Sequence, residues 1–221
     1  MTLKSKIPNF KSVSKELRLP IDELLTIDKI ISSAGGSVKL VGGNVRDLLL
    51  NKKMTSEPDL TTDLKPAEIV TCMKGENIKY IKTGYKYGTI TVIINKNRFE
   101  ITSLRRDIKP DGRWSKVSYT KDWLEDSKRR DFTINSIYCD LNGNLLDPHN
   151  GLLDLENKKV IFIGNPIDRI NEDYLRILRF IRFSIKYSKS FDKKGLNACK
   201  KLKNKINTLS EDRRISELKK I

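Results

Sequence analysis

The chain has 221 residues, of which 38% are apolar and 33% are charged. These proportions are typical of a folded protein with a modest core and exclude a disordered chain. No apolar run approaches the roughly 20 residues that span a bilayer, and the first residues lack the apolar segment of a secretory signal. We therefore expect no membrane partner and a cytoplasmic protein.

A large positive charge is the second compositional feature. The chain carries 44 Lys and Arg against 28 Asp and Glu, a formal net charge of +16. This surplus favours a polyanionic partner such as nucleic acid, although a biased genome rich in Lys, Asn and Ile codons would produce a similar composition.

Cysteine and histidine exclude several kinds of site. Cys72, Cys139 and Cys199 are isolated and form neither a zinc pattern nor a disulfide framework, which favours a reducing compartment. His149 is the sole histidine, so a metal site with several histidines is excluded and catalysis by histidine is disfavoured.

The predicted elements begin after a basic, loosely patterned leader over residues 1–20. Apolar spacing over 21–35 predicts an amphipathic helix that ends at a glycine pair. The pattern then predicts a strand over 37–41, a helix over 44–51, a short strand over 58–61 and a helix that begins at Pro66.

Glycines and acids flank the helix predicted over 44–51. Gly42 and Gly43 have no Cβ, so backbone N–H groups beside them can approach a phosphate closely. Glu57 and Asp59 lie two residues apart on an extended segment, so they face the same way and can hold a divalent cation. Such a combination suits phosphoryl or nucleotidyl transfer. The plain alternative is a strand, turn and helix with solvated acids.

Further strands are predicted over 78–81, 89–94 and 99–104. Glu100 in the last of these is a third candidate metal carboxylate, or else an acid on a solvated face. After these strands, the sequence predicts a mobile polar loop over 105–128, a hairpin over 137–147 and a last strand over 160–163.

Arg129, Arg130 and Asp131 form a second cluster, followed by Asn135. Guanidinium groups can clamp phosphate oxygens, and a carboxylate can accept a hydrogen bond from a ribose hydroxyl. The alternative is a surface charge pair at the start of a helix.

From residue 171 onward the pattern is helical. On such a helix Asp173 and Arg176 are i, i+3 neighbours and together can read the edge of a base, or form an ordinary salt bridge. The same helix is expected to expose Arg176, Arg179 and Arg182 as a basic face and to bury Leu175, Leu178, Ile181 and Ile185.

Taken in order, these segments resemble the motifs of the class II nucleotidyltransferases, the family of tRNA CCA-adding enzymes and bacterial poly(A) polymerases. Residues 42–47 match the family pattern G-G-x-V-R-D, and residues 172–176 match E-D-x-x-R. Residues 129–136 match R-R-D-F-T-x-N-A except for the final residue, which is Ser136. One departure concerns the metal site. Where the family has D-x-D, this chain has Glu57-Pro58-Asp59, so the first acid is one methylene longer.

The resemblance implies an α+β fold in two parts. A nucleotidyltransferase head over residues 21–165 would hold a mixed, mostly antiparallel sheet of about five strands with flanking helices. An all-α partial neck over 166–221 would follow. Residues 209–218 are similar to the next neck motif, after which the chain ends at Ile221. We therefore expect a truncated neck, and one expectation is a separate polypeptide that carries the body and tail domains.

The resemblance also implies site roles. Glu57 and Asp59 would hold Mg²⁺, with assistance from Glu100, so that the 3′ end of tRNA or of another RNA attacks CTP or ATP. Gly42, Gly43 and Arg46 would contact phosphates. The triphosphate or the ribose would be contacted by Arg129, Arg130, Asp131 and Asn135. The base would be chosen by Asp173 and Arg176, with Arg179 and Arg182 beside them.

Two classes of function stay open at this level. The first is an RNA 3′-terminal nucleotidyltransferase that adds CCA to tRNA, or adds poly(A) tails instead. The second is a catalytically weak fragment that binds nucleotide or RNA, or one subunit of a split enzyme. The substitution at Glu57 predicts an impaired metal site, because Mg²⁺ demands close octahedral geometry.

Overall fold

The computed structural model describes residues 5–53, 57–109 and 116–221. Its centre is a seven-stranded sheet in the order β3-β4-β5-β2-β1-β8-β9. Every pairing in the sheet is antiparallel except that of β2 with β5, which is parallel. The strands are β1 (Val38–Val41), β2 (Asp59–Thr62), β3 (Lys79–Gly84), β4 (Thr89–Ile94), β5 (Asn97–Ser103), β8 (Tyr138–Cys139) and β9 (Leu145–Leu146).

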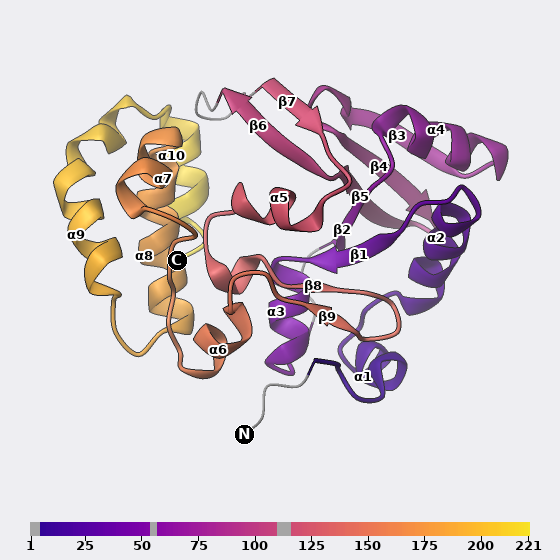
Figure 1. Ribbon diagram of the computed structural model, residues 1–221, viewed down its shortest axis with the longest axis horizontal. Helices are drawn as coiled ribbons and strands as arrows, with labels where there is room; N and C mark the ends of the chain where they lie inside the picture. The colour runs from indigo at the N-terminus through magenta and orange to yellow at the C-terminus, as the bar shows by residue number, and fades with distance from the viewer. Residues whose placement is uncertain (1–4, 54–56, 110–115) are drawn as a thin grey trace.

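The longer helices form two sets, one beside the sheet and one at the end of the molecule away from it (Figure 1). Beside the sheet lie α1 (Phe10–Glu16), α2 (Ile21–Ser33), α3 (Gly43–Leu49) and α4 (Pro66–Gly75). Apolar side chains of α2 recur at helical spacing and are fully buried, among them Leu24, Ile27 and Ile31, and they share one core with the central strands.

The C-terminal helices enclose a second core. They are α7 (Pro166–Glu172), α8 (Leu175–Tyr187), α9 (Lys193–Leu202) and α10 (Glu211–Leu218), with the 3₁₀ turn η3 (Lys203–Thr208) between the last two. Phe132, Phe162 and Phe180 form the centre of this core, with ring centroids 4.9 Å to 6.1 Å apart. Since Phe132 closely follows Arg129 and Arg130, the second core anchors the predicted arginine motif.

The remaining described elements are short, and the predicted arginine motif at 129–131 lies between two of them. They are the hairpin β6 (Arg105–Lys109) and β7 (Lys116–Tyr119), the helices α5 (Trp123–Lys128) and α6 (Gly151–Glu156), and the 3₁₀ turns η1 (Tyr85–Tyr87) and η2 (Thr133–Asn135).

The expected fold class is confirmed: a mixed, mostly antiparallel sheet with flanking helices precedes an all-α segment. The strand number differs, because the short hairpin of β8 and β9 extends the sheet from about five strands to seven. The predicted last strand over 160–163 makes only a single bridge, from Phe162 to Phe132.

Three local predictions are wrong. Residues 105–128 are not a loop where they are described, because they form β6, β7 and α5. The expected leader packs against the sheet, with Ile7 and Phe10 in the main core. Helix α8 buries the predicted Leu178, but its other buried apolar residues are Ile177, Phe180, Phe183 and Tyr187, and the predicted Ile185 is 58% exposed.

No helix within the described residues is long and apolar enough to cross a membrane.

Candidate active site

Asp59 and Glu100 face one another across the parallel pair β2 and β5. They are register partners in that pair, so their side chains lie on the same face of the sheet, and both residues are exposed. The backbone N–H of Asp59 donates to the Asn44 side-chain oxygen at 2.8 Å, and the N–H of Glu100 donates to the Pro58 carbonyl at 3.2 Å. Strand pairing and the Asn44 bond together fix the two acids.

The electrostatics of this pair suit a cation. The pKa of Asp59 is raised to about 6. The largest cause is the partial burial of its carboxyl group, and the carboxylates of Glu100 and Glu57 raise it further, whereas Arg130 lowers it. A positive ion between the acids would relieve this repulsion.

Glu57 is turned toward a different partner. Its Oε1 lies 3.4 Å from Nε of Arg98, and both side chains are about half exposed. Among the described residues no group of three acidic, histidine or cysteine side chains is arranged to hold a metal ion. The structure therefore places two predicted metal acids, Asp59 and Glu100, side by side and leaves Glu57 in a solvent-exposed ion pair.

The glycine pair forms the turn from β1 into α3. Gly42 has φ of +69°, a conformation that residues with a Cβ rarely adopt. Among the described residues, a Cβ on Gly43 would meet only the Arg46 guanidinium, at 3.5 Å. The glycine pair thus leaves the backbone of this turn without side chains of its own, as the predicted phosphate contact requires.

Four predicted site residues form one chain of hydrogen bonds between α3 and α8. Arg46 Nη1 donates to Asn135 Oδ1 at 2.6 Å, and Asn135 Nδ2 donates to Asp131 Oδ1 at 3.1 Å. Arg179 Nε then donates to Asp131 Oδ2 at 2.7 Å. Burial raises the pKa of Asp131, but Arg179 and Asn135 outweigh burial and hold the pKa below its ordinary value.

Arg46 itself is buried. Its guanidinium carbon lies 4.2 Å from the ring centroid of Tyr187, and its side chain is only 7% exposed. The structure thus places Arg46 as a link between helices, and its predicted phosphate contact remains a prediction.

Asp126 organises the arginine motif, and sequence reasoning missed it. This fully buried carboxylate accepts hydrogen bonds from Arg129 Nε at 2.9 Å, Arg130 Nη2 at 3.1 Å and the Tyr138 hydroxyl at 2.8 Å. Burial raises its pKa, but Arg129, Arg130 and the Tyr138 bond outweigh this and hold the pKa at about 2. The i, i+3 and i+4 spacing of Asp126 from the two arginines was the available signal.

Arg105 adds a third guanidinium to this cluster. Burial and the charge of Arg129 lower the pKa of Arg105 to about 10, and its Nε has no hydrogen-bond partner among the described residues. Arg105, Arg129 and Arg130 thus lie around Asp126, and Asp107 is a second carboxylate that acts on Arg105. The cluster carries an excess of positive charge, as an anion site requires.

Arg169 and Arg176 hold the backbone of the arginine motif from the C-terminal helices. Arg169 Nη2 donates to the carbonyls of Arg129 and Arg130, at 2.6 Å and 2.8 Å. Arg176 Nη2 donates to the Arg129 carbonyl at 3.2 Å, and both arginines pair with Glu172. Arg169 was not predicted, because its bonds join residues about 40 positions apart in the sequence.

Asp173 and Arg176 are not neighbours on one helix, so that prediction is wrong. Helix α7 ends at Glu172, and Asp173 is extended, with φ of −156°. Asp173 Oδ1 accepts from the Leu175 N–H at 3.1 Å and its Oδ2 accepts from Arg213 Nη2 at 2.8 Å. The break aims Asp173 toward α10, while Arg176 faces the arginine motif.

The expected basic face of α8 is likewise divided among carboxylates. Arg179 pairs with Asp131, and Arg182 Nε lies 2.5 Å from Oε1 of Glu217, which is 3% exposed. These arginines therefore connect α8 to Asp131, just before η2, and to α10.

Two cavities differ in their relation to this site. A charged cavity of about 180 Å³ is lined by Arg106, Asp107, Glu125, Lys128, Arg129, Arg169 and Glu172, and so adjoins the arginine motif. A larger apolar groove of about 620 Å³, lined chiefly by residues of α1, α3, α6 and their flanks, contains none of the predicted site residues.

Comparison with known proteins identifies relatives that are named as nucleotidyltransferases or as CCA-adding enzymes. Residues 38–161 match the family model of the poly A polymerase head domain. The human "CCA tRNA nucleotidyltransferase 1, mitochondrial" is 40% identical over 195 residues, which are 88% of this chain and 43% of that protein.

Solved structures give the same result. The Bacillus stearothermophilus CCA-adding enzyme in complex with CTP matches with a TM-score of 0.81 at 28% identity, covering 91% of this chain and 48% of that one. A tRNA nucleotidyltransferase complexed with a primer tRNA and an incoming ATP analog matches with a TM-score of 0.71 at 26% identity, covering 87% and 55%.

The chain thus spans about half the length of the relatives that it matches. Mitochondrial and bacterial proteins both occur among them, so the expected cytoplasmic location is not confirmed. The comparisons give no support to the expected separate polypeptide.

Proposed function

Since this chain belongs to the family of the poly A polymerase head domain, we propose that it is an RNA 3′-terminal nucleotidyltransferase. In this proposal it adds CMP and AMP from CTP and ATP to the 3′ end of tRNA and releases pyrophosphate. The observation that carries the proposal is the pairing of Asp59 with Glu100 beside a glycine turn, in a chain that also holds a surplus of arginine around Asp126. The relatives' printed names favour CCA addition over poly(A) synthesis.

The acids fit a divalent cation of the Mg²⁺ type. Asp59 and Glu100 offer hard oxygen ligands on one sheet face, and the raised pKa of Asp59 reflects, beside burial, the repulsion that a cation would relieve. Glu57 would join them after release from Arg98, which costs little because exposed ion pairs contribute about 0–1 kcal/mol. Bound by these residues, Mg²⁺ would activate the RNA 3′-hydroxyl and neutralise triphosphate charge.

Arg129 and Arg130 are proposed to contact the triphosphate. Their side chains are 17% and 16% exposed, and Asp126 fixes one edge of each guanidinium while other N–H donors stay available. Pre-orientation by Asp126 reduces the entropy that the arginines lose when they bind phosphate. Arg105 adds charge at the same place.

Asp131 and Asn135 are proposed to act as positioning residues. Both oxygens of the Asp131 carboxylate already accept hydrogen bonds within the protein, and Asn135 uses its oxygen for Arg46 and its NH₂ group for Asp131. Together they hold η2 against α3 and α8, and so hold the motif that precedes η2.

Base choice is assigned to Asp173 and Arg176. Arg176 places its Nη1 on Glu172 and the Arg169 carbonyl, so its Nε–H and one Nη2–H remain for a base edge. Asp173 keeps acceptor capacity beyond its bonds to the Leu175 N–H and to Arg213. Donors and acceptors of these types can distinguish cytosine and adenine from the other bases.

The proposal is tested by product analysis. The full chain is incubated with Mg²⁺ and with labelled CTP and ATP, on tRNA that lacks its 3′ CCA and on an unrelated RNA of equal length. Ordered addition of C, C and A to the tRNA alone is expected. Extension of both RNAs with A alone would assign poly(A) synthesis instead. Nucleotide binding without incorporation would identify a catalytically weak fragment.

A further inference from the structure

An exposed lysine surface lies on α9, far from the acids on β2 and β5. Residues 189–203 contain six lysines, all exposed, and the single acid Asp192, so this short segment contributes a net +5 of the total +16. We call this surface the lysine face: Lys189, Lys193, Lys194, Lys200, Lys201 and Lys203. Asp192 is already engaged, because its carboxylate accepts the Gly195 N–H at 2.7 Å.

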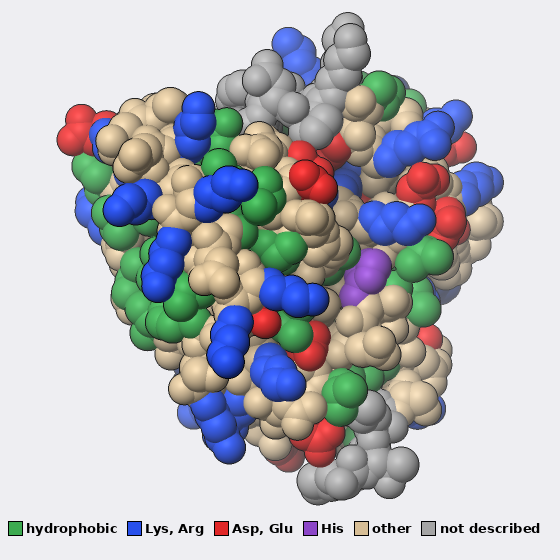
Figure 2. All heavy atoms as spheres, turned by 60° about the vertical axis from the view of Figure 1, so that its left-hand side comes forward, with side chains coloured by type: hydrophobic (Ala, Val, Ile, Leu, Met, Phe, Trp, Pro, Cys, Tyr) green, Lys and Arg blue, Asp and Glu red, His purple; other side chains and the backbone are tan. Residues whose placement is uncertain are grey.

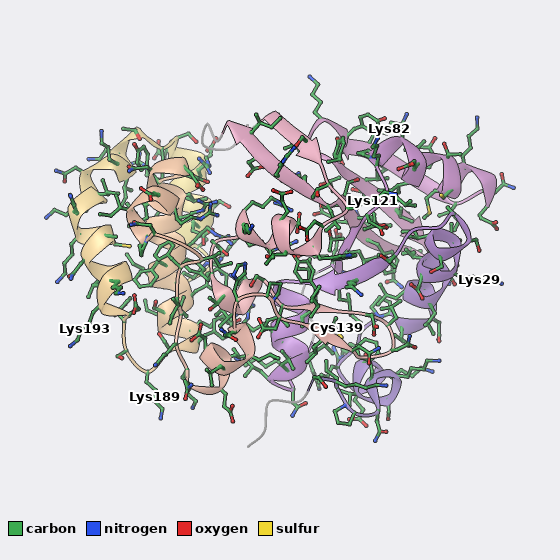
Figure 3. All side chains as sticks on the ribbon, in the orientation of Figure 1. Lys29, Lys82, Lys121, Cys139, Lys189 and Lys193 are labelled. Atoms are coloured by element: carbon green, nitrogen blue, oxygen red, sulfur yellow. The ribbon has the colours of Figure 1, made fainter. Side chains whose placement is uncertain are left out.

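The lysine face is not neutralised by the protein itself. Within the described part of the chain none of its six ammonium groups forms an ion pair. Figure 2, which brings this end of the molecule forward, shows basic side chains spread over the surface, with acidic side chains at its centre and right as well. Lys189 and Lys193 both project outward from it (Figure 3).

Packing of α9 turns the lysines away from the core. Gly195, Ala198 and Cys199 are buried on the opposite side of the helix. A Cβ on Gly195 would come within 2.8 Å of the Phe180 ring, so this side fits closely against the second core. Because its apolar side is occupied, α9 has no free apolar face to insert into a lipid surface.

Spacing and residue type indicate what the lysine face can bind. The pairs Lys193–Lys194 and Lys200–Lys201 are two helical turns apart, about 10 Å along the axis, so they can meet separate phosphates. Lysine is a flexible point charge that contacts phosphates without reading sequence. Phe191, the one aromatic residue of the segment 189–203, has its ring centroid 5.9 Å from that of Phe180 and is 37% exposed. One partly exposed ring cannot stack successive bases, as sites for single-stranded nucleic acid do.

We propose that the lysine face binds the phosphate backbone of a double-helical RNA stem, at a surface separate from the candidate active site. Helix α9 lies on the outer side of α7 and α8, away from the sheet that carries Asp59 and Glu100 (Figure 1). The inference shares with the proposed function the premise that the partner is RNA. It is tested by binding alone, so either proposal can fail without the other.

The test compares two variants with equal loss of charge. One carries Lys193→Gln, Lys194→Gln, Lys200→Gln and Lys201→Gln. Its control carries Lys11→Gln, Lys15→Gln, Lys29→Gln and Lys74→Gln, exposed lysines of α1, α2 and α4 at the other end of the molecule. Binding of a fluorescent RNA hairpin is followed by anisotropy between about 50 and 200 mM NaCl, a range over which phosphate contacts change the affinity strongly. Circular dichroism checks folding, and if either variant unfolds, Lys200→Gln with Lys201→Gln is compared instead with Lys11→Gln and Lys15→Gln.

The lysine-face variant is expected to bind at least about tenfold more weakly, and its salt slope is expected to shrink by about 0.9 for each phosphate that it no longer neutralises. If the parent chain binds the hairpin through the lysine face but does not extend tRNA, the proposed function fails and the RNA-binding proposal is still supported. An unchanged slope, or an equal change in the control, would overturn the proposal. Preferential loss of binding to single-stranded RNA would overturn the duplex assignment, and binding to phosphatidylserine vesicles but not to the hairpin would overturn the RNA assignment.

Discussion

At the scale of single residues, the site depends on carboxylates that have different partners. Asp59 and Glu100 face each other, Glu57 faces Arg98, and Asp126 faces two arginines. Burial and the neighbouring carboxylates raise the pKa of Asp59, so its ionised form is unfavourable beside Glu100, whereas Asp126 is satisfied by partners within the protein. A carboxylate's role in this molecule therefore follows from its neighbours rather than from its residue type.

Glu57→Asp is expected to raise nucleotidyl transfer and to lower the Mg²⁺ concentration that gives half-maximal rate, by up to about tenfold. The shorter side chain loses its reach to Arg98 and regains the length that the family pattern has. Arg98→Gln, which frees Glu57 without moving it, serves as the matched variant and is expected to act in the same direction. If Glu57→Asp leaves activity unchanged or lowers it, the idea of an impaired metal site is wrong.

Asp126→Asn is expected to destabilise the fold by about 3–5 kcal/mol at pH 7, because two arginines lose a buried partner. The pKa of Asp126 is depressed to about 2 in the folded state, against about 3.9 in an unfolded chain. Its contribution is therefore complete above about pH 4 and is lost as the pH falls toward 2.

Urea unfolding of parent and variant at pH 7, 5 and 3 checks this expectation, and the difference between them should shrink at pH 3. Asp122→Asn is the control on the same helix, where an exposed N-cap accepts the Leu124 N–H and asparagine caps equally well. A difference that stays constant with pH would contradict the assigned charge state of Asp126.

At the scale of elements, α7 connects the C-terminal helices to the arginine motif. Arg169 on α7 bonds to both carbonyls of the Arg129–Arg130 pair, and Glu172 at the end of the helix binds Arg169 and Arg176. Movement of α7 is therefore coupled to the position of the proposed triphosphate contacts.

Arg169→Lys is expected to lower the free energy of unfolding by about 2 kcal/mol, since an ammonium group cannot bond both carbonyls and Glu172 in the guanidinium geometry. Weaker CTP binding, measured by calorimetry, should accompany it. Arg106→Lys is the control, because Arg106 is 60% exposed and its pair with Glu125 spans 3.8 Å. If both substitutions change the free energy of unfolding and the CTP affinity equally, the proposed role of Arg169 is wrong.

Elements with a strong local pattern could be predicted from sequence. The helix over 21–35 and the β-branched strand over 89–94 lie where their periodicity and composition place them. The 105–128 segment could not, because β6 and β7 pair mostly with each other as a separate two-stranded sheet, and their sequence is polar. The face of α8 was misplaced because its arginines have partners just before η2 and on α10.

Site residues could be predicted where they belong to a short sequence motif or to a strand with clear alternation. Asp59 and Glu100 were found from strand alternation, and the structure adds their parallel register. Asp126 was missed because its i, i+3 and i+4 spacing from Arg129 and Arg130 does not reveal that its carboxylate is buried. Arg169 was missed because it bonds to carbonyls about 40 positions away. The break at Asp173 was missed because its neighbours on both sides are helical.

At the scale of the whole molecule, two cores meet at the arginine motif. The sheet carries the acids, and the C-terminal helices carry the residues assigned to base choice. The exposed lysines of α9 lie on the outer side of α7 and α8, away from the sheet (Figure 1). Chemistry and RNA attachment are thus assigned to separate parts of one chain.

The central claim is that Asp59 and Glu100 serve nucleotidyl transfer. It is tested most directly by the rate of labelled CMP incorporation into tRNA lacking CCA, in the parent chain, Asp59→Asn, Glu100→Gln and the exposed control Glu76→Gln. We predict incorporation by the parent and by Glu76→Gln, and a loss of roughly 100-fold or more in the two site variants. Equal rates in parent and Asp59→Asn, or no incorporation by the parent, would contradict the claim.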